Sequence, residues 1–223
     1  PMRYGGNYKS YGPQYPRGIQ EGNGVPADGD LWVSYSVNKE DMWISRIPVP
    51  VEINASAHAD DDFSKNKSIA ELTDWNIYSP VWAPVSLEDQ WLKLQDKDPF
   101  DYAKVERKIP ASKELKVSFD LKAGQNNKGT LHIEFLDENG IACSRMELTD
   151  DGIFRLKGGS RFANMMKYEA GKIYHVEAVL STVDRNIQVY VDGKRVGLRM
   201  FYAPVAAVER IVFRTGVPST FPT

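Results

Sequence analysis

Residues 173–195, IYHVEAVLSTVDRNIQVYVDGKR, decide the fold class. Apolar and polar residues alternate through both halves of this stretch, and the apolar positions are Tyr174, Val176, Ala178 and Leu180, then Ile187, Val189 and Val191. Alternation with a period of two puts one side of a β-strand into a core. The pair Asp192-Gly193 follows the second half and suits a two-residue type I′ turn. The stretch therefore predicts antiparallel strands that each bury one face.

The same alternation continues on both sides of this stretch, from Trp75 onward. Further apolar faces are Leu115, Val117, Phe119 and Leu121, then Leu131, Ile133 and Phe135, and finally Ile211 and Phe213. Turn residues separate them at Glu138-Asn139-Gly140 and Asp150-Asp151-Gly152. Roughly ten strands at regular spacing predict an antiparallel β-sandwich over residues 75–216. Helix is confined to a turn or two at Ser68–Leu72 and Phe162–Tyr168.

The chain before residue 75 has a different character. Residues 1–30 hold many Gly, Pro, Tyr and Asn without periodicity and are predicted as loop. Leu31–Val37 and Met42–Ile47 are β-rich runs, which predict a hairpin across a four-residue connector. A lone hairpin is only marginally stable, so it must dock on something. Together with the preceding loop it defines a segment 1–50, and the polar residues 51–74 are predicted as a linker.

Composition restricts the function classes. The chain has 223 residues, of which 42% are hydrophobic, enough for a sizeable core. Lys plus Arg number 28 and Asp plus Glu number 30, so the basic excess of a nucleic-acid-binding surface is missing. The single cysteine, Cys143, excludes a disulfide or a cysteine-based zinc site within the chain and is predicted to be a small core residue. No stretch has the ~18 apolar residues of a membrane span, and a start at Pro1 suggests a piece of a longer protein.

Several stretches resemble known carbohydrate-active proteins. Tyr15–Ile19 (YPRGI) and Gly29–Pro48 (GDLWVSYSVNKEDMWISRIP) resemble the closing part of a sialidase-like (BNR-type) β-propeller of secreted bacterial polysaccharide-degrading proteins. Phe119–Asn127 (FDLKAGQNN) and Val189–Arg195 (VYVDGKR) resemble the concanavalin-like (laminin-G-like) jelly rolls often appended to such propellers. The arginine cluster and Asp-box repeats of sialidases are missing, so no complete active site is expected.

The resemblance implies an all-β chain. Residues 1–50 would be the last strands of a propeller, 51–74 a linker and 75–216 a concanavalin-like sandwich. The parent protein would hydrolyse or eliminate glycosidic bonds and would be secreted, periplasmic or on the cell surface. Its partners would be an oligo- or polysaccharide and the upstream propeller domain, without nucleic acid or a membrane span.

Candidate catalytic residues lie before Pro48. Glu40 and Asp41 are adjacent in the hairpin connector, and Lys39 beside them could balance charge or, in a lyase, stabilise an enolate. The guanidinium of Arg17 could form a bidentate pair of hydrogen bonds with the carboxylate of a uronate or sialate. Glycoside hydrolysis needs two carboxylates that face each other across the bond. A solvated turn is the competing interpretation, because adjacent side chains usually point apart.

Two groups are candidates for sugar binding. The first combines aromatic rings with an arginine, and its members are Tyr15, Arg17, Trp32, Tyr35 and Trp43. The competing interpretation is that these side chains pack the hairpin, with both tryptophans in a core. The second comprises Gln125, Asn126 and Asn127, whose amides can donate to and accept from sugar hydroxyls. The alternative for this second group is an ordinary turn.

Calcium is the cofactor that the acidic residues suggest. Asp96, Asp98 and Asp101 cluster in a turn-rich stretch and could bind calcium or sugar hydroxyls, with a plain turn as the alternative. Asp60-Asp61-Asp62 is a weaker candidate, since consecutive carboxylates usually form a solvated segment. The three histidines, His58, His132 and His175, have no metal-ligand spacing and are interpreted as structural.

Three functions remain open on the sequence. The chain could be a carbohydrate-binding or stabilising module of a polysaccharide-degrading enzyme, a glycoside hydrolase or polysaccharide lyase. Alternatively, its N-terminal segment could complete a glycosidase or lyase active site together with upstream blades. The third hypothesis is a sandwich for protein or cell-surface adhesion.

Overall fold

The stretch that decides the fold forms two neighbouring strands of one sheet. In the computed structural model, β13 (Ile173–Ser181) pairs antiparallel with β14 (Asn186–Val191), and the turn after β14 leads into β15 (Lys194–Met200). Asp192 and Gly193 have φ angles of 50° and 77°. Both values are positive, as a type I′ turn requires, so the predicted turn is confirmed.

The structure describes residues 13–19, 30–37, 41–47, 59–98 and 101–216. The chain divides into two compact units, Pro1–Asn54 and Ala55–Thr223, and each is described by itself. Within the described residues no helix has the length and apolar character of a membrane-spanning segment.

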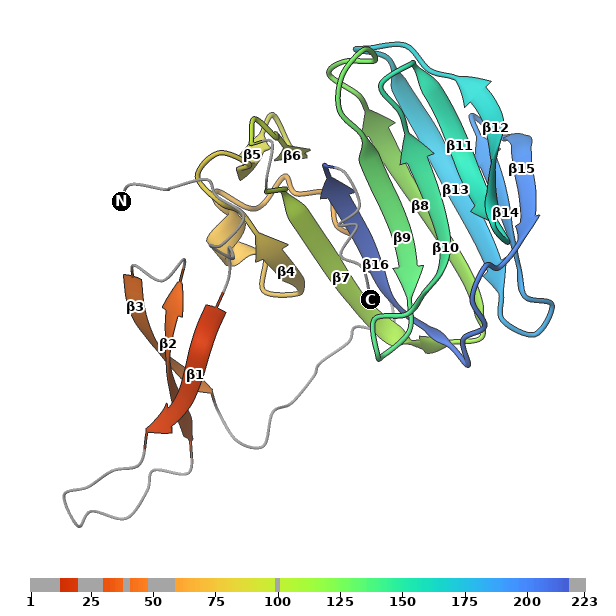
Figure 1. The fold of residues 1–223 in the computed structure, drawn as a ribbon. Helices are drawn as coiled ribbons and strands as arrows, with labels where there is room; N and C mark the ends of the chain where they lie inside the picture. Colours follow the sequence, from red (N-terminus) through yellow and green to blue (C-terminus); the bar gives the residue numbers. More distant parts are fainter. Residues whose placement is uncertain (1–12, 20–29, 38–40, 48–58, 99–100, 217–223) are drawn as a thin grey trace. The chain divides into compact units, whose positions relative to one another are not determined.

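The second unit is an antiparallel sandwich of two stacked sheets (Figure 1). Its seven-stranded sheet has the order β12-β11-β10-β9-β16-β7-β4, and its four-stranded sheet has the order β15-β14-β13-β8. The strands not yet placed are β4 (Trp75–Tyr78), β7 (Lys104–Ser112), β8 (Glu114–Lys122), β9 (Leu131–Leu136), β10 (Ala142–Leu148), β11 (Ile153–Gly158), β12 (Arg161–Lys167) and β16 (Val208–Thr215). The predicted all-β antiparallel sandwich is confirmed.

The inner faces of both sheets form one apolar core. Its fully buried side chains include Ile133, Phe135, Met146, Leu156, Val176, Leu180, Ile187 and Val189. Each large apolar side chain contributes about 1.5–3 kcal/mol when buried. Leu115, Val117, Phe119 and Leu121 pack against this core from β8, as their alternation predicts. Cys143 also lies in it, as predicted, and burial raises the pKa of its thiol to about 12.

A smaller apolar cluster extends the interior next to β7. It is built from Ala83, Val85, Ala103 and Val105, and β5 (Val85–Glu88), β6 (Trp91–Leu94) and the 3-10 helix η1 (Ile69–Glu71) supply its surroundings. Phe213 packs against both clusters and so joins them. The short helical turn predicted at Ser68–Leu72 is confirmed by η1.

The second predicted helical turn, at Phe162–Tyr168, is wrong. Most of it belongs to β12, which pairs antiparallel with β11, with Phe162 opposite Lys157. The spacing of Phe162, Met165 and Met166 mimics a helix face, but a register shift in the β11–β12 pair produces the same spacing in a strand. The turn at Gly159, with φ of 57°, returns the chain beside β11, where its backbone groups find partners.

The described part of the predicted linker packs onto the sandwich. The guanidinium of Arg107, which is buried, pairs with Asp61 at 2.9 Å and with Asp74 at 3.2 Å. The ring of Phe63 lies 5.9 Å from that of Trp75. Residues 59–74 therefore belong to the second unit, whereas 51–58 lie outside the described residues.

The first unit is a three-stranded sheet with the order β1-β2-β3. The predicted hairpin is confirmed by β2 (Leu31–Val37) and β3 (Asp41–Ile47), although Asp41 opens β3 instead of closing the connector. The prediction of loop throughout residues 1–30 is wrong, because β1 (Pro13–Ile19) pairs with β2. Prolines and a register irregularity hide β1 from pattern analysis, and such features are typical of edge strands.

Candidate functional site

The outer face of the seven-stranded sheet, turned away from the four-stranded sheet, is built from charged residues. Along β9 the core residues Ile133 and Phe135 alternate with His132 and Glu134, which are also buried. Strand register places the neighbours of these two residues on the same face. We call this the charged face; its ionisable members are Lys104, Glu106, Lys108, His132, Glu134, Arg145, Glu147, Arg155, Lys157, Arg210 and Arg214.

Glu147 is the most deeply buried acid of the charged face. Its side chain is 2% exposed and accepts hydrogen bonds from Arg155 Nε at 2.8 Å and His132 Nδ1 at 3.0 Å. Burial alone raises the pKa of this carboxyl, but the hydrogen bonds and positive charges of His132 and Arg155 outweigh it, so the pKa lies below its ordinary value. Glu147 is therefore a carboxylate at neutral pH.

His132 links Glu147 to the end of β16. Its Nε2 lies 2.7 Å from the carbonyl oxygen of Gly216, and Nδ1 faces the Glu147 carboxylate. His132 thus bridges the buried Glu147 carboxylate and the backbone at the end of β16. This position of His132 agrees with the prediction that it is structural. His175, for which the same role was predicted, is exposed beside Asp120.

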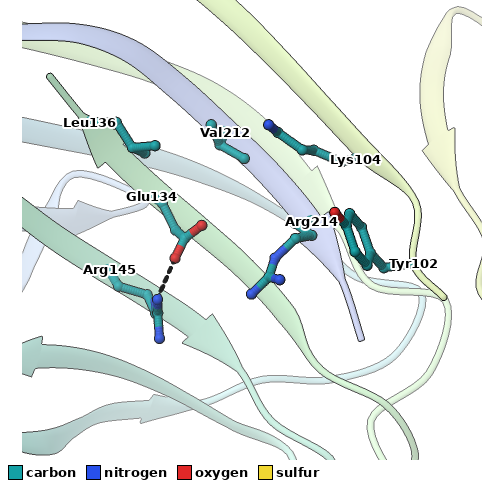
Figure 2. A pocket seen from close by; sticks show the side chains of 7 residues that line it. All are labelled: Tyr102, Lys104, Glu134, Leu136, Arg145, Val212 and Arg214. Carbon is teal, nitrogen blue, oxygen red and sulfur yellow. Dashed lines mark hydrogen bonds and ion pairs between the residues drawn. The ribbon is translucent and has the colours of Figure 1, made fainter. Parts of the chain in front are cut away.

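A pocket of about 310 Å³ opens on the charged face. Figure 2 shows its lining. It comes from β7, β9, β10 and β16 and from one residue two positions before β7, and consists of Tyr102, Lys104, Glu134, Leu136, Arg145, Val212 and Arg214. Arg145 binds Glu134 Oε1 through Nη2 at 2.5 Å and through Nε at 2.7 Å. Lys104 pairs with Glu106 at 2.7 Å. Two of the three cations in the pocket are thus held by carboxylates.

Arg214 is the third cation of the pocket, and its environment differs. Its guanidinium carbon lies 5.3 Å from the centre of the Tyr102 ring, a cation–π distance. In Figure 2 the side chain lies between Arg145 and Tyr102. Its Nε is buried without a hydrogen-bond partner, and no carboxylate of the described residues forms an ion pair with it. The pocket therefore contains one guanidinium whose charge is not balanced by the described chain.

Tyr202 is a further polar group beside the charged face. Its hydroxyl is buried and has no hydrogen-bond partner among the described residues. Burial raises the pKa of this hydroxyl to about 12, and the nearby charge of Arg145 opposes the shift only in part. Lys157 lies 4.2 Å from the centre of its ring. Tyr102 thus lies beside Arg214, whereas Tyr202 lies near Arg145.

The catalytic candidates lie in the first unit. Arg17 is exposed on β1, and its carbonyl accepts from the Ser34 hydroxyl at 3.5 Å. Lys39 and Glu40 lie outside the described residues, and of Asp41 only the backbone position at the start of β3 is described. Their catalytic roles stay predictions.

The aromatic candidates of the first unit occupy different surroundings. Tyr15 is exposed and has φ of 53° at the irregularity in β1. Tyr35 shares a hydrogen bond of 2.9 Å with Ser45, and Trp32 lies under the guanidinium of Arg46. Trp43 was expected in a core but is 53% exposed, because no described element of this unit covers β3.

The amide candidates lie in the loop between β8 and β9. Gln125 donates to the carbonyl of Lys128 at 2.7 Å, so part of its hydrogen-bonding capacity is used within the loop. Asn127 is exposed and Asn126 is half-buried beside Gly152. None of the three lines the pocket. Their role in binding sugar stays a prediction.

The acidic candidates take part in local hydrogen bonds. Asp101 accepts from the Tyr78 hydroxyl at 3.1 Å and from the backbone of Tyr102 at 2.9 Å, and Asp96 accepts from the backbone of Asp98 at 3.0 Å. Asp62 in the earlier acidic run accepts from Ser64. In the part of the chain that the structure describes, no three His, Cys, Asp or Glu side chains are grouped to hold a metal ion. Calcium stays a prediction.

The charged face was missed by the sequence analysis. The signal was present in β9 and β10, where charged residues occupy the positions between core residues in two consecutive strands. Alternation indicates which residues form the core, but it does not show whether the charged residues between them are buried. Sequence could not show that β16 separates β7 from β9, which brings Arg214 and Val212 beside Glu134.

Comparison with known proteins identifies the family. The model of the Sialidase-like, CBM domain family matches residues 75–223. A solved structure named "Sialidase" is 90% identical over 100% of this chain with a TM-score of 0.84, and this chain spans 21% of its length. An apo Crh5 transglycosylase structure is similar in fold, with 11% identity, a TM-score of 0.53 and coverage of 75% of this chain and 73% of that one. No curated protein matches. The chain belongs to the sialidase-like family of carbohydrate-binding module (CBM) domains.

Proposed function

We propose that the sandwich binds carbohydrate in the pocket of the charged face, as a module of a longer polysaccharide-degrading protein. The observation that carries this proposal is the pocket itself. Val212, Leu136 and the Tyr102 ring supply apolar surface beside the hydrogen-bonding groups of Glu134 and Arg145. Sugar rings present apolar faces and hydroxyls together, and small-molecule sites of about 300–1,000 Å³ combine the same two kinds of lining. The volume of about 310 Å³ suits one sugar unit.

Binding without cleavage is the expected behaviour of the sandwich. Hydrolysis of a glycosidic bond generally uses two carboxylates on opposite sides of the bond. Among the residues that line the pocket, Glu134 is the single carboxylate, and Arg145 holds it. We therefore assign catalysis to the rest of the parent protein, a glycoside hydrolase or a polysaccharide lyase.

The first unit is proposed to complete a β-propeller of that parent. Its three-stranded sheet exposes Met42, Trp43 and Ile44, which favours a covering element elsewhere in a longer chain. The 21% share of the sialidase chain that this chain spans agrees with a longer parent. In the same proposal, the parent is secreted or displayed at the cell surface. The chain consists of the propeller segment 1–50, the linker 51–74 and the sandwich 75–216, and it binds a calcium ion.

A second candidate places part of the active site in the first unit. Arg17 and Tyr15 are exposed neighbours there and could meet substrate bound by upstream blades. Substituting Arg17 or Glu40 in the full-length parent should then lower turnover without unfolding the protein. Unchanged rates would exclude this candidate. If the chain binds a protein and no glycan, its function is adhesion.

A pair of tyrosine variants tests the proposed function. Tyr102 lines the pocket, whereas Tyr190 lies on the outer face of the four-stranded sheet, where its hydroxyl donates to Gln188 at 3.0 Å. The wild-type chain is applied to a broad glycan panel, and each ligand found is titrated against Tyr102→Ala and Tyr190→Ala, with melting temperatures as a check on folding. We expect Tyr102→Ala alone to weaken binding, without release of cleaved sugar by any variant. Silence of the wild-type chain across the panel would refute the function.

A further inference from the structure

The charge of the pocket narrows the class of ligand. Lys104, Arg145 and Arg214 line it against a single carboxylate, Glu134, although the whole chain has a net charge of -2. The neighbouring Arg210 adds a cation that shares Glu106 with Lys104, at 3.4 Å and 2.7 Å. The positive charge is thus concentrated on one face and does not follow from composition. A neutral sugar would leave it unbalanced.

Arg214 is the group that lacks a partner. A half-buried guanidinium without a counter-charge loses hydration and gains no ion pair in return, which is unfavourable unless another charge supplies the balance. The buried Nε of Arg214 has no acceptor among the described residues, and the Tyr102 ring holds the guanidinium from one side. Its open side, toward Arg145 in Figure 2, is the place for an anion.

We propose that the pocket binds a sugar that carries a carboxylate, of the uronate or sialate class, with the carboxylate on Arg214. This inference rests on the proposed function and names its ligand class. A guanidinium presents parallel N–H groups that match both oxygens of a carboxylate.

The remaining lining fits the rest of such a sugar. Glu134 uses Oε1 for Arg145, and no described residue bonds its Oε2, which can accept from a sugar hydroxyl. Leu136 and Val212 face the ring. Lys104 and Arg145 add positive charge around the carboxylate without having to release their partners.

Matched ligands test the class. The 223-residue chain is titrated by calorimetry with trigalacturonate and with its fully methyl-esterified form, and separately with 3′-sialyllactose and with its methyl ester. We expect the acidic member of one pair to bind about tenfold or more tightly, as loss of a charge-assisted contact costs about one factor of ten or more. Raising the salt concentration should weaken that binding, because ions screen the contact. The pair that responds tells uronate from sialate.

The outcomes separate the ligand class from the function. If the two members of each pair bind with equal affinity and a neutral glycan binds in the same pocket, the proposed preference for a carboxylate is wrong, whereas the proposed carbohydrate binding stands. A sulfated glycan that binds in place of both acidic sugars would also overturn it. Absence of binding to any glycan would remove both proposals.

Arginine variants test the residue. Arg214→Gln removes the unbalanced charge, and Arg195→Gln removes an exposed arginine next to β14 on the opposite sheet. We expect Arg214→Gln to abolish the preference for the acidic ligand, whereas Arg195→Gln should keep it. Arg214→Lys, which keeps the charge but not the paired N–H groups, should recover part of the preference. A preference retained in a folded Arg214→Gln variant would overturn the assignment.

Discussion

The two outer faces of the sandwich carry similar residue types in different states. On the four-stranded sheet, Lys116 pairs with Glu177 at 2.7 Å, and their side chains are 65% and 26% exposed. On the charged face, Arg145 pairs with Glu134 at 2.5 Å, and their side chains are 18% and 10% exposed. Exposed pairs contribute little because water and salt screen them, whereas buried pairs are costly to break. Burial, not the presence of ion pairs, therefore distinguishes the two faces.

The largest expected difference between the faces comes from one substitution made on each. Glu147→Gln leaves His132 and Arg155 without their carboxylate in a buried site, so we expect a loss of about 3–5 kcal/mol in the free energy of unfolding. Glu177→Gln breaks an exposed pair and should cost at most about 1 kcal/mol. Urea unfolding followed by tryptophan fluorescence at pH 7 measures both values. Equal losses would show that the charged face is as solvated as the other.

Acid should act mainly through the charged face. The pKa of Glu147 in the folded protein lies below its unfolded value, so the stability that its ionisation supplies is present above the unfolded pKa of about 4.3 and is lost as the pH falls through the folded pKa. The free energy of unfolding, measured between pH 7 and pH 3, should fall in that acidic window. Glu147→Gln should flatten the fall, and Glu177→Gln should leave it as in the wild type. A steep fall that persists in Glu147→Gln would contradict this account.

Removing one cation from each outer face should show the same contrast, with smaller losses of stability. Arg145→Met leaves the buried Glu134 without its partner and should destabilise the protein by about 1–3 kcal/mol. Lys116→Met on the opposite face should change stability by less than about 0.5 kcal/mol. Thermal unfolding of both variants beside the wild type gives the comparison. If Arg145→Met is as stable as Lys116→Met, the Arg145–Glu134 pair does not stabilise the folded protein.

Arg214 should have a smaller effect on stability than Glu147 or Arg145. It forms no ion pair with a described residue, and its contact with the Tyr102 ring is a cation–π contact, so Arg214→Gln should change the free energy of unfolding by no more than about 1 kcal/mol. Denaturant unfolding without ligand measures this value, with Arg195→Gln as the control. A loss of several kcal/mol would mean that Arg214 supports the fold and is not kept for a ligand.

The sequence predicted the fold better than the site. Alternation in residues 173–195 and the Asp192-Gly193 turn were sufficient for the sandwich, because a strand with one buried face has a period that local sequence shows directly. β1 and β12 were missed, since proline in one and a register shift in the other disturb that period. The charged face depends on the order of strands that are distant in sequence, β10, β9, β16 and β7. Glu134 and Val212 become neighbours only through that order.

The central claim is that the charged face, and not the opposite one, holds the ligand. Nitrogen-15 NMR spectra recorded during titration of the chain with trigalacturonate, and in a second titration with 3′-sialyllactose, test it most directly. We predict that the acidic sugar shifts the amide signals of Arg145, Val212 and Arg214 and the Nε signal of Arg214, and leaves those of Lys116 and Glu177 in place. Shifts confined to the outer face of the four-stranded sheet, or to Tyr15 and Arg17 in the first unit, would contradict the account.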